Sequence, residues 1–203
     1  MSPRTPTGAA VFKPVVTRAI TEAVLDEFAE QGYGRLSMEG VAKRAGVGKS
    51  ALYRRWPSKQ DMVVSVLSEF SVEISDVPDT GSLRGDLRAT LDNLMEWIGD
   101  TRFARIFPDL IAESARTPRL AQLHKELIGV PRRERAVVVF RRAIDRGEIP
   151  AEIDLELALD LLAGPVYWRF AVRGVEVNST YLDEIADAMI GALNGFGQGS
   201  RSA

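Results

Sequence analysis

The chain has 203 residues, of which 45% are hydrophobic and 27% are charged, a composition typical of a folded protein that buries a core. It contains no cysteine and a single histidine, His124, which excludes disulfides, thiolate metal sites and histidine clusters. No apolar run approaches the roughly 20 residues that a membrane span needs, and residues 1–13 lack the apolar segment of a signal peptide, so we expect a cytoplasmic protein.

The net charge of −2 is unevenly distributed along the chain. Residues 1–60 contain ten lysines and arginines against five acidic residues, a net charge of +5, whereas the remaining residues sum to −7. A basic end joined to an acidic body is expected when only that end meets phosphate. The pattern favours nucleic acid as a partner, although solvated surfaces can show the same imbalance.

Apolar residues recur with the 3.6-residue period of a helix along almost the whole chain, and alternation with a period of two is almost absent. The sequence therefore predicts an all-α fold of about nine helices. Glycines and prolines divide the chain into a flexible arm at 1–12, a basic N-terminal domain at 13–60, a linking helix at 61–77 and a larger helical domain at 78–200.

The N-terminal domain contains two short helices joined by a glycine-containing turn, which is the requirement for a helix-turn-helix. Ser37 is a suitable N-cap for the first of them, and Gly46 and Gly48 permit the turn before the second, at about residues 49–56. The second helix packs inward through Leu52 and leaves a polar, basic face. Such a face fits the major groove of DNA. It comprises Lys49, Ser50, Tyr53 and Arg54.

The stretch from Ile20 to Met62 resembles the DNA-binding domain of the TetR (tetracycline-repressor-like) family. The matching positions, at fixed spacing, are Phe28, Gly32-Tyr33, Ser37, Val41-Ala42, Ala45-Gly46-Val47, Leu52-Tyr53, Trp56 and Ser58-Lys59. Two positions depart from the pattern. Many members have serine where this chain has Gly48, so the second short helix lacks a side-chain cap, and Arg55 replaces an aromatic residue or histidine.

The resemblance implies a homodimeric repressor that leaves a (pseudo)palindromic double-stranded DNA operator when a small molecule binds. It assigns Ser37, Tyr53 and Lys59 to phosphates, and Lys49, Ser50 and Arg54 to bases. Ser37 stands at a helix N-terminus, which favours a phosphate, and Arg54 could donate a bidentate pair to guanine. No cofactor or metal is expected.

Residues 78–200 resemble the family's regulatory domain more loosely, and residues 145–169 look like a stretch that belongs to the dimer-forming helix in one branch. The resemblance therefore predicts a ligand-binding and dimerisation domain. An apolar stripe on two helices is predicted to form a four-helix contact across a two-fold axis. The stripe consists of Leu155, Leu159, Leu162, Val166, Phe170, Ile185, Met189 and Leu193.

Aromatic side chains cluster in the helices that resemble those around the family's effector pocket. They are Trp97, Phe103, Phe107, Tyr167 and Trp168. Pro108 and Gly164-Pro165 would kink two of these helices, and kinks open space between packed helices. A pocket with this lining favours a small apolar or aromatic effector, and the alternative for each residue is ordinary core packing.

Two other functions fit parts of the sequence. Gly48-Lys49-Ser50 has the form of the end of a phosphate-binding P-loop, but that loop requires glycine at position 43, where this chain has Lys43, and a preceding strand. A helical protein–protein adaptor would not need a polar, basic face on an exposed helix. A catalytic or metal role for His124 lacks a second histidine or a cysteine. The sequence thus favours a DNA-binding repressor over an enzyme.

Overall fold

The computed structural model describes residues 14–73 and 77–199, and the predicted arm at 1–12 lies outside this range. Within these residues the chain forms helices and no strand, which confirms the all-α prediction. The described part contains ten α-helices. A π-helical turn joins α7 and α8 into one continuous helix, so nine separate helices remain, as predicted. No helix in the described ranges is both long and apolar enough to cross a membrane.

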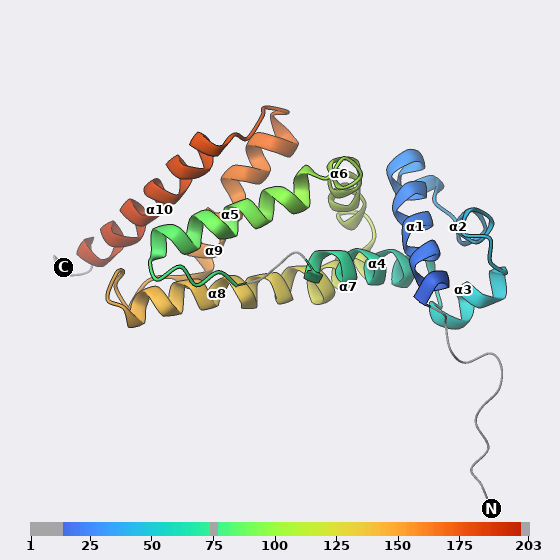
Figure 1. Cartoon of the computed structure of the whole chain (residues 1–203), viewed down its shortest axis with the longest axis horizontal. Helices are drawn as coiled ribbons and strands as arrows, with labels where there is room; N and C mark the ends of the chain where they lie inside the picture. The colour runs from blue at the N-terminus through green and yellow to red at the C-terminus, as the bar shows by residue number, and fades with distance from the viewer. Residues whose placement is uncertain (1–13, 74–76, 200–203) are drawn as a thin grey trace, which may run out of the picture.

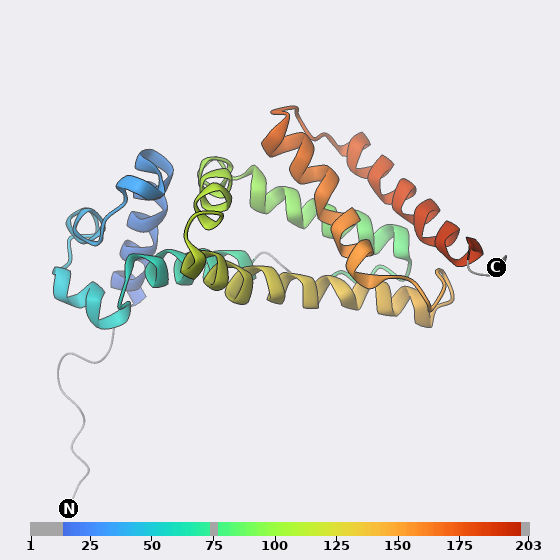
Figure 2. The ribbon, with the colours of Figure 1, turned by 180° about the vertical axis from the view of Figure 1, so that it is seen from behind.

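Two groups of helices follow each other along the elongated molecule (Figures 1 and 2). The first contains α1 (Pro14–Arg35), α2 (Met38–Arg44), α3 (Lys49–Arg55) and α4 (Lys59–Glu73). The second contains α5 (Leu83–Gly99), α6 (Phe103–Ser114), α7 (Pro118–His124), α8 (Val130–Asp145), α9 (Leu155–Tyr167) and α10 (Ser179–Gly199), with π-helical turns at Lys125–Gly129 and Trp168–Val172. Figure 1 shows α1–α3 at one end and α10 at the other, with α4 lying against α7.

The short helices of the first group begin where the sequence predicts. The Ser37 hydroxyl accepts a hydrogen bond from the Gly40 backbone N–H at 3.0 Å, which confirms the N-cap of α2. Gly46, with a φ of 66°, makes the turn that a side chain would strain, and Gly48 precedes α3 without a side-chain cap. These caps and turns fix the angle between α2 and α3.

The first helix, α1, is interrupted near its end. Gly32 has a φ of 74° and a ψ of 164°, so the helix is interrupted there, but a further turn continues to Arg35. The Leu36 N–H donates to the Gly32 carbonyl at 3.1 Å and closes this turn. A Cβ at position 32 would lie 3.2 Å from the Asp109 carboxylate, so glycine also permits α6 to approach.

One continuous core of buried apolar side chains joins the two groups of helices. Phe28 and Leu52 anchor the first group, and Phe103 and Phe140 anchor the second, all with at most 1% of their surface exposed. Each such side chain stabilises the fold by roughly 1.5–3 kcal/mol through burial. The core therefore holds α3 in a fixed position relative to α1.

Candidate functional site

The outward face of α3 is a polar surface at one end of the molecule (Figure 1). Lys49, Ser50, Tyr53 and Arg54 are all exposed, whereas Leu52 between them has no exposed surface. Ser37, at the N-terminus of the neighbouring α2, is also exposed. The structure thus presents to solvent five of the six residues that the sequence assigns to DNA.

Lys49 is already engaged with a carboxylate. Its ammonium donates a hydrogen bond to the Glu39 side chain on α2, and this contact lowers the pKa of Glu39. The ammonium also lies 5.8 Å from the centre of the Tyr53 ring. A base edge or phosphate that takes up Lys49 has to compete with Glu39 for it.

Lys59, the sixth residue, lies apart from the α3 face. Its half-buried ammonium donates to the Tyr33 carbonyl at 2.8 Å and lies 4.1 Å from the centre of the Tyr33 ring, and burial lowers the pKa of this group. The side chain therefore fastens the start of α4 to the end of α1. An ammonium has three N–H groups, so one of them can still serve a phosphate.

Arg55, at one of the two positions that depart from the family pattern, ties α3 to two other helices. Its guanidinium donates to the Thr17 hydroxyl on α1 at 3.1 Å, approaches Glu69 on α4 at 3.6 Å, and stacks on the Trp56 ring at 4.4 Å. Arg55 therefore supports the polar face from behind rather than forming part of it.

Besides the contact of α4 with α7, the first group of helices meets the second where α1 lies against α6. The Asp109 carboxylate accepts the Tyr33 backbone N–H at 2.6 Å, and Arg102 donates to Glu22 on α1 at 2.6 Å. Sequence reasoning missed both residues, because their partners lie 76 and 80 positions away and no local pattern marks them. They place α1 directly on α6.

Four of the five predicted pocket aromatics form one packed cluster. The ring centroid of Trp97 lies 5.3 Å from that of Phe103 and 5.1 Å from that of Phe107. The ring centroids of Phe107 and Tyr167 lie 5.6 Å apart. The space beside the cluster measures about 10 Å³, which is no more than one water molecule needs. The cluster is therefore core, the alternative that the sequence left open.

Trp168 requires a correction, because 59% of it is exposed and it takes no part in this cluster. The sequence pattern predicts a regular α-helix through this residue. A π-helical turn begins here instead and rotates the following side chains relative to that pattern.

The His124 ring packs on the Phe107 ring, with 6.3 Å between the two ring centroids. Burial lowers the pKa of His124, which favours the neutral imidazole in a structural role.

A larger cavity of about 130 Å³ lies between α5, α8 and α9. Leu94, Val139, Leu159 and Leu162 give it apolar walls, and Arg132, Arg133 and Arg135 of α8 also line it. None of the five predicted pocket aromatics is among its lining residues. This cavity is therefore a different space from the one that the sequence indicated.

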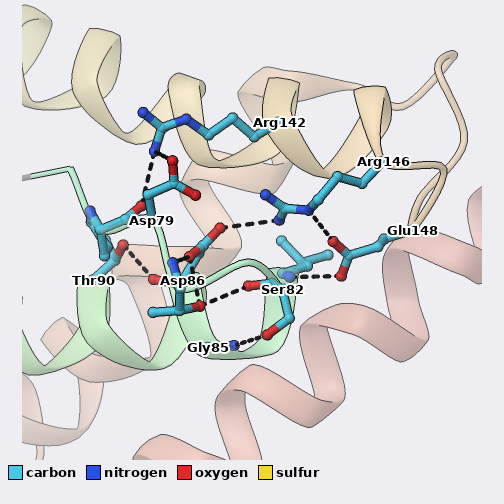
Figure 3. Close-up of polar contacts among 11 residues, drawn as sticks. Asp79, Ser82, Gly85, Asp86, Thr90, Arg142, Arg146 and Glu148 are labelled. Carbon is cyan, nitrogen blue, oxygen red and sulfur yellow. Dashed lines mark hydrogen bonds and ion pairs between the residues drawn. The ribbon is translucent and has the colours of Figure 1, made fainter.

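A polar cluster fastens the segment after α4 to α8 beside this cavity (Figure 3). Asp86, which has no exposed surface, accepts hydrogen bonds from the Thr80 N–H at 2.6 Å and from Arg146 at 3.1 Å. Burial raises the pKa of Asp86, but these bonds outweigh it and hold the pKa below its usual value. Arg142 donates to the Pro78 carbonyl at 3.1 Å, so Pro78, which lines the cavity, is held in place.

The predicted dimer stripe also requires a correction. Leu159, Leu162, Val166, Ile185, Met189 and Leu193 each expose 5% or less of their surface within a single chain, and Leu155 and Phe170 are half-buried. Side chains that are already covered by their own chain have almost no surface left for a second chain. The stripe thus lies mostly on the inner face of α9 and α10, although Ile185 and Met189 also line a groove between these helices.

The outer face of the same two helices carries a groove. Its volume is about 420 Å³, and it is lined by Leu161, Pro165, Tyr181, Glu184, Ala188 and Ala192 together with Ile185 and Met189 of the predicted stripe. The small alanines leave room for the close approach of another helix. Two apolar side chains of the region beside it are exposed, Leu157 by 39% and Trp168 by 59%.

Comparison with known proteins covers almost the whole described chain. Residues 20–66 match the family model "Bacterial regulatory proteins, tetR family", and residues 77–189 match "Tetracyclin repressor-like, C-terminal domain". The sequence is 28% identical to the uncharacterized HTH-type transcriptional regulator YdeS of Bacillus subtilis over 88% of each chain. It is also 28% identical to the DNA-binding transcriptional repressor TetR of Mycobacteroides abscessus, over 86% of this chain and 87% of that protein.

Solved structures agree with this match. The TetR family transcription regulator SCO0332 superposes with a TM-score of 0.71 at 28% identity, over 86% of this chain and 96% of that one. Salmonella enterica GusR has the same TM-score at 21% identity, over 91% and 96% of the two chains, which shows a shared fold.

Proposed function

Because the chain belongs to the TetR family and is a DNA-binding transcriptional regulator rather than an enzyme, we propose that it is a homodimeric repressor that a small molecule releases from its operator. The observation that carries the proposal is the exposed polar face of α3, held outward by the buried Leu52. This face has the size and chemistry to enter a major groove. The protein would work in the cytoplasm on double-stranded DNA.

The resemblance to the family supports a division of these residues between base contacts and phosphate contacts. Lys49, Ser50 and Arg54 of α3 would contact base edges, and Ser37, Tyr53 and Lys59 would contact phosphates. Arg54 is the residue most suited to select a base, because its planar guanidinium can donate two parallel hydrogen bonds to guanine. Residues 13–60 would form the DNA-binding domain, 61–77 the linking helix and 78–200 the ligand-binding and dimerisation domain.

We assign the dimer contact to the outer face of α9 and α10. The groove between Leu161 and Ala188 would receive the same helices of a second chain, forming a four-helix contact across a two-fold axis. The exposed Leu157 and Trp168 would be covered as well. A two-fold dimer places two α3 helices on a (pseudo)palindromic site.

Fluorescence anisotropy with DNA from upstream of the protein's own gene tests the proposal. Arg54→Ala should weaken binding about tenfold or more, because one bidentate contact contributes roughly 1–3 kcal/mol of discrimination. Arg141→Ala is the matched control, since Arg141 is exposed and belongs to α8, a helix that lies away from α3 (Figure 1). Absence of binding to any duplex at low salt, or equal loss in both variants, would contradict the proposal.

A further inference from the structure

The contact between Glu39 and Lys49 joins the two short helices at the DNA-binding end. Glu39 lies on α2, and Lys49 is the first residue of α3, ten positions later in the chain. The turn between the helices is fixed, because the Val47 N–H donates to the Ala42 carbonyl at 3.0 Å and Leu52 is fully buried. The packing of α2 on α3 therefore places the two charged residues side by side.

Both members of this pair are exposed, and both are charged at neutral pH. The side chain of Glu39 is 70% exposed and that of Lys49 is 51% exposed. The hydrogen bond between them lowers the pKa of the Glu39 carboxyl and raises the pKa of the Lys49 ammonium. A duplex that meets the face of α3 therefore also meets a negative charge, which repels its phosphates.

The ammonium of Lys49 has more donors than Glu39 uses. It carries three N–H groups, and the hydrogen bond to Glu39 takes one of them. Guanine presents two acceptors, O6 and N7, at its major-groove edge. The N-terminal residues of a recognition helix lie nearest the base edges, and Lys49 is the first residue of α3. Lys49 can therefore bind a guanine without leaving Glu39.

A phosphate offers Lys49 less than a guanine does. Lysines that neutralise phosphates release counterions, and this release supplies nearly all of the affinity for DNA of arbitrary sequence. The charge of Lys49 is already balanced by Glu39, so a phosphate has to displace the carboxylate before it gains the full charge. Glu39 therefore weakens binding to arbitrary DNA more than binding to an operator that has guanine at this position.

We propose that Glu39 is a specificity-determining residue, one that positions Lys49 for a base edge and withholds it from phosphates. The inference rests on the proposed base contact of Lys49. It adds a carboxylate of α2 to the residues of α3 that select the operator. Glu39 touches no base itself and acts through Lys49.

Fluorescence anisotropy with two duplexes tests the inference, one being the operator selected from a random pool and the other the same sequence scrambled. Glu39→Gln should raise affinity for the scrambled duplex at least about tenfold at low salt. The plot of log affinity against log salt should steepen by about 2 for a dimer, because Lys49 of each protomer then reaches a phosphate. Operator affinity should change far less, so the ratio of the two affinities falls about tenfold.

Two further variants separate this role from a general effect of charge. Glu30→Gln removes an exposed carboxylate of α1 that pairs with Arg44, and it should leave the salt slope unchanged, because Arg44 also pairs with Glu27 at 3.0 Å. In a Lys49→Met background, Glu39→Gln should no longer change the slope, because the charge that it would free is absent. Thermal unfolding is recorded for every variant and should change little, since exposed ion pairs contribute little to stability.

Equal gains for the operator and the scrambled duplex would overturn the inference, since Glu39 would then act only as a repulsive charge. An unchanged affinity and slope in Glu39→Gln, a gain that persists in the Lys49→Met background, or the same gain in Glu30→Gln would overturn it as well. Failure of the unaltered chain to bind any duplex, or to select one from the pool, would instead contradict the proposed function and remove the inference with it.

Discussion

The DNA-binding end of this protein (α1–α4) and its body (α5–α10) are both built from amphipathic helices. They differ in how many faces of each helix are apolar. On α3 the apolar Leu52 points inward and Lys49, Ser50, Tyr53 and Arg54 point outward. On α9, Leu159 and Leu162 are buried, and Leu157 and Leu161 are at least partly exposed. When a helix has one polar face, its sequence shows which side meets solvent. When a helix is apolar on two sides, its sequence does not show which side packs in the core and which side can bind a partner.

The sharpest test of this difference compares two adjacent residues of α3. Leu52→Ala should lower the free energy of unfolding by about 2–5 kcal/mol, because it leaves a cavity at a fully buried site. Tyr53→Ala, one position along, should leave unfolding within about 0.5 kcal/mol and weaken operator binding instead. Chemical denaturation and anisotropy measure the two effects. Similar destabilisation by both changes would mean that the face of α3 is not divided as described.

The corresponding test on the body concerns the outer face of α9 and α10. Ala188→Arg places a long charged side chain in the groove and should produce monomers, with operator affinity reduced about 100-fold or more by the loss of the second half-site. Sedimentation equilibrium gives the mass. Ala151→Arg, at an exposed turn after α8, is the control and should remain dimeric. A dimeric Ala188→Arg protein would show that the contact lies elsewhere.

A substitution of Asp86 tests whether this residue fastens the segment after α4 to α8. Asp86→Asn should lower the free energy of unfolding at neutral pH by about 2 kcal/mol, because Asp86 is buried and bonded to Arg146. Its pKa is lower in the folded protein than in the unfolded chain, so this contribution is present above pH of about 4 and is lost as pH falls further.

Denaturation at several pH values therefore checks both the size and the sign of this effect. The difference between the two proteins should shrink below pH of about 4. Asp187→Asn removes the exposed ion pair with Arg84 and serves as a surface control that should change little. A constant difference down to low pH would contradict the account of Asp86.

The smallest expected effect concerns the turn between α2 and α3. Gly46→Ala should cost about 1 kcal/mol, because φ is 66° there and an L-residue is strained in that region. Gly34→Ala is the matched control, since an added Cβ meets nothing within 4 Å and the φ of Gly34 is not positive. Thermal denaturation should show the loss only for Gly46→Ala.

The features that the sequence predicts well are local ones. The all-α class, the Ser37 cap and the inward position of Leu52 follow from side chains within a few residues of each other. The bonds of Asp109 to Tyr33 and of Arg102 to Glu22 join distant parts of the chain, so no local pattern reveals them. The cavity beside Arg132 depends on how three helices pack, and the exposure of Trp168 depends on a π-helical turn.

Selection of bound duplexes from a random DNA pool tests the central claim most directly. A dimer that reads DNA through two α3 helices should enrich one inverted repeat with half-sites about one helical turn apart. Under the same selection, Arg54→Ala should relax the sequence at one symmetric pair of positions. No enriched sequence, a single unpaired half-site, or an unchanged preference with Arg54→Ala would contradict the account.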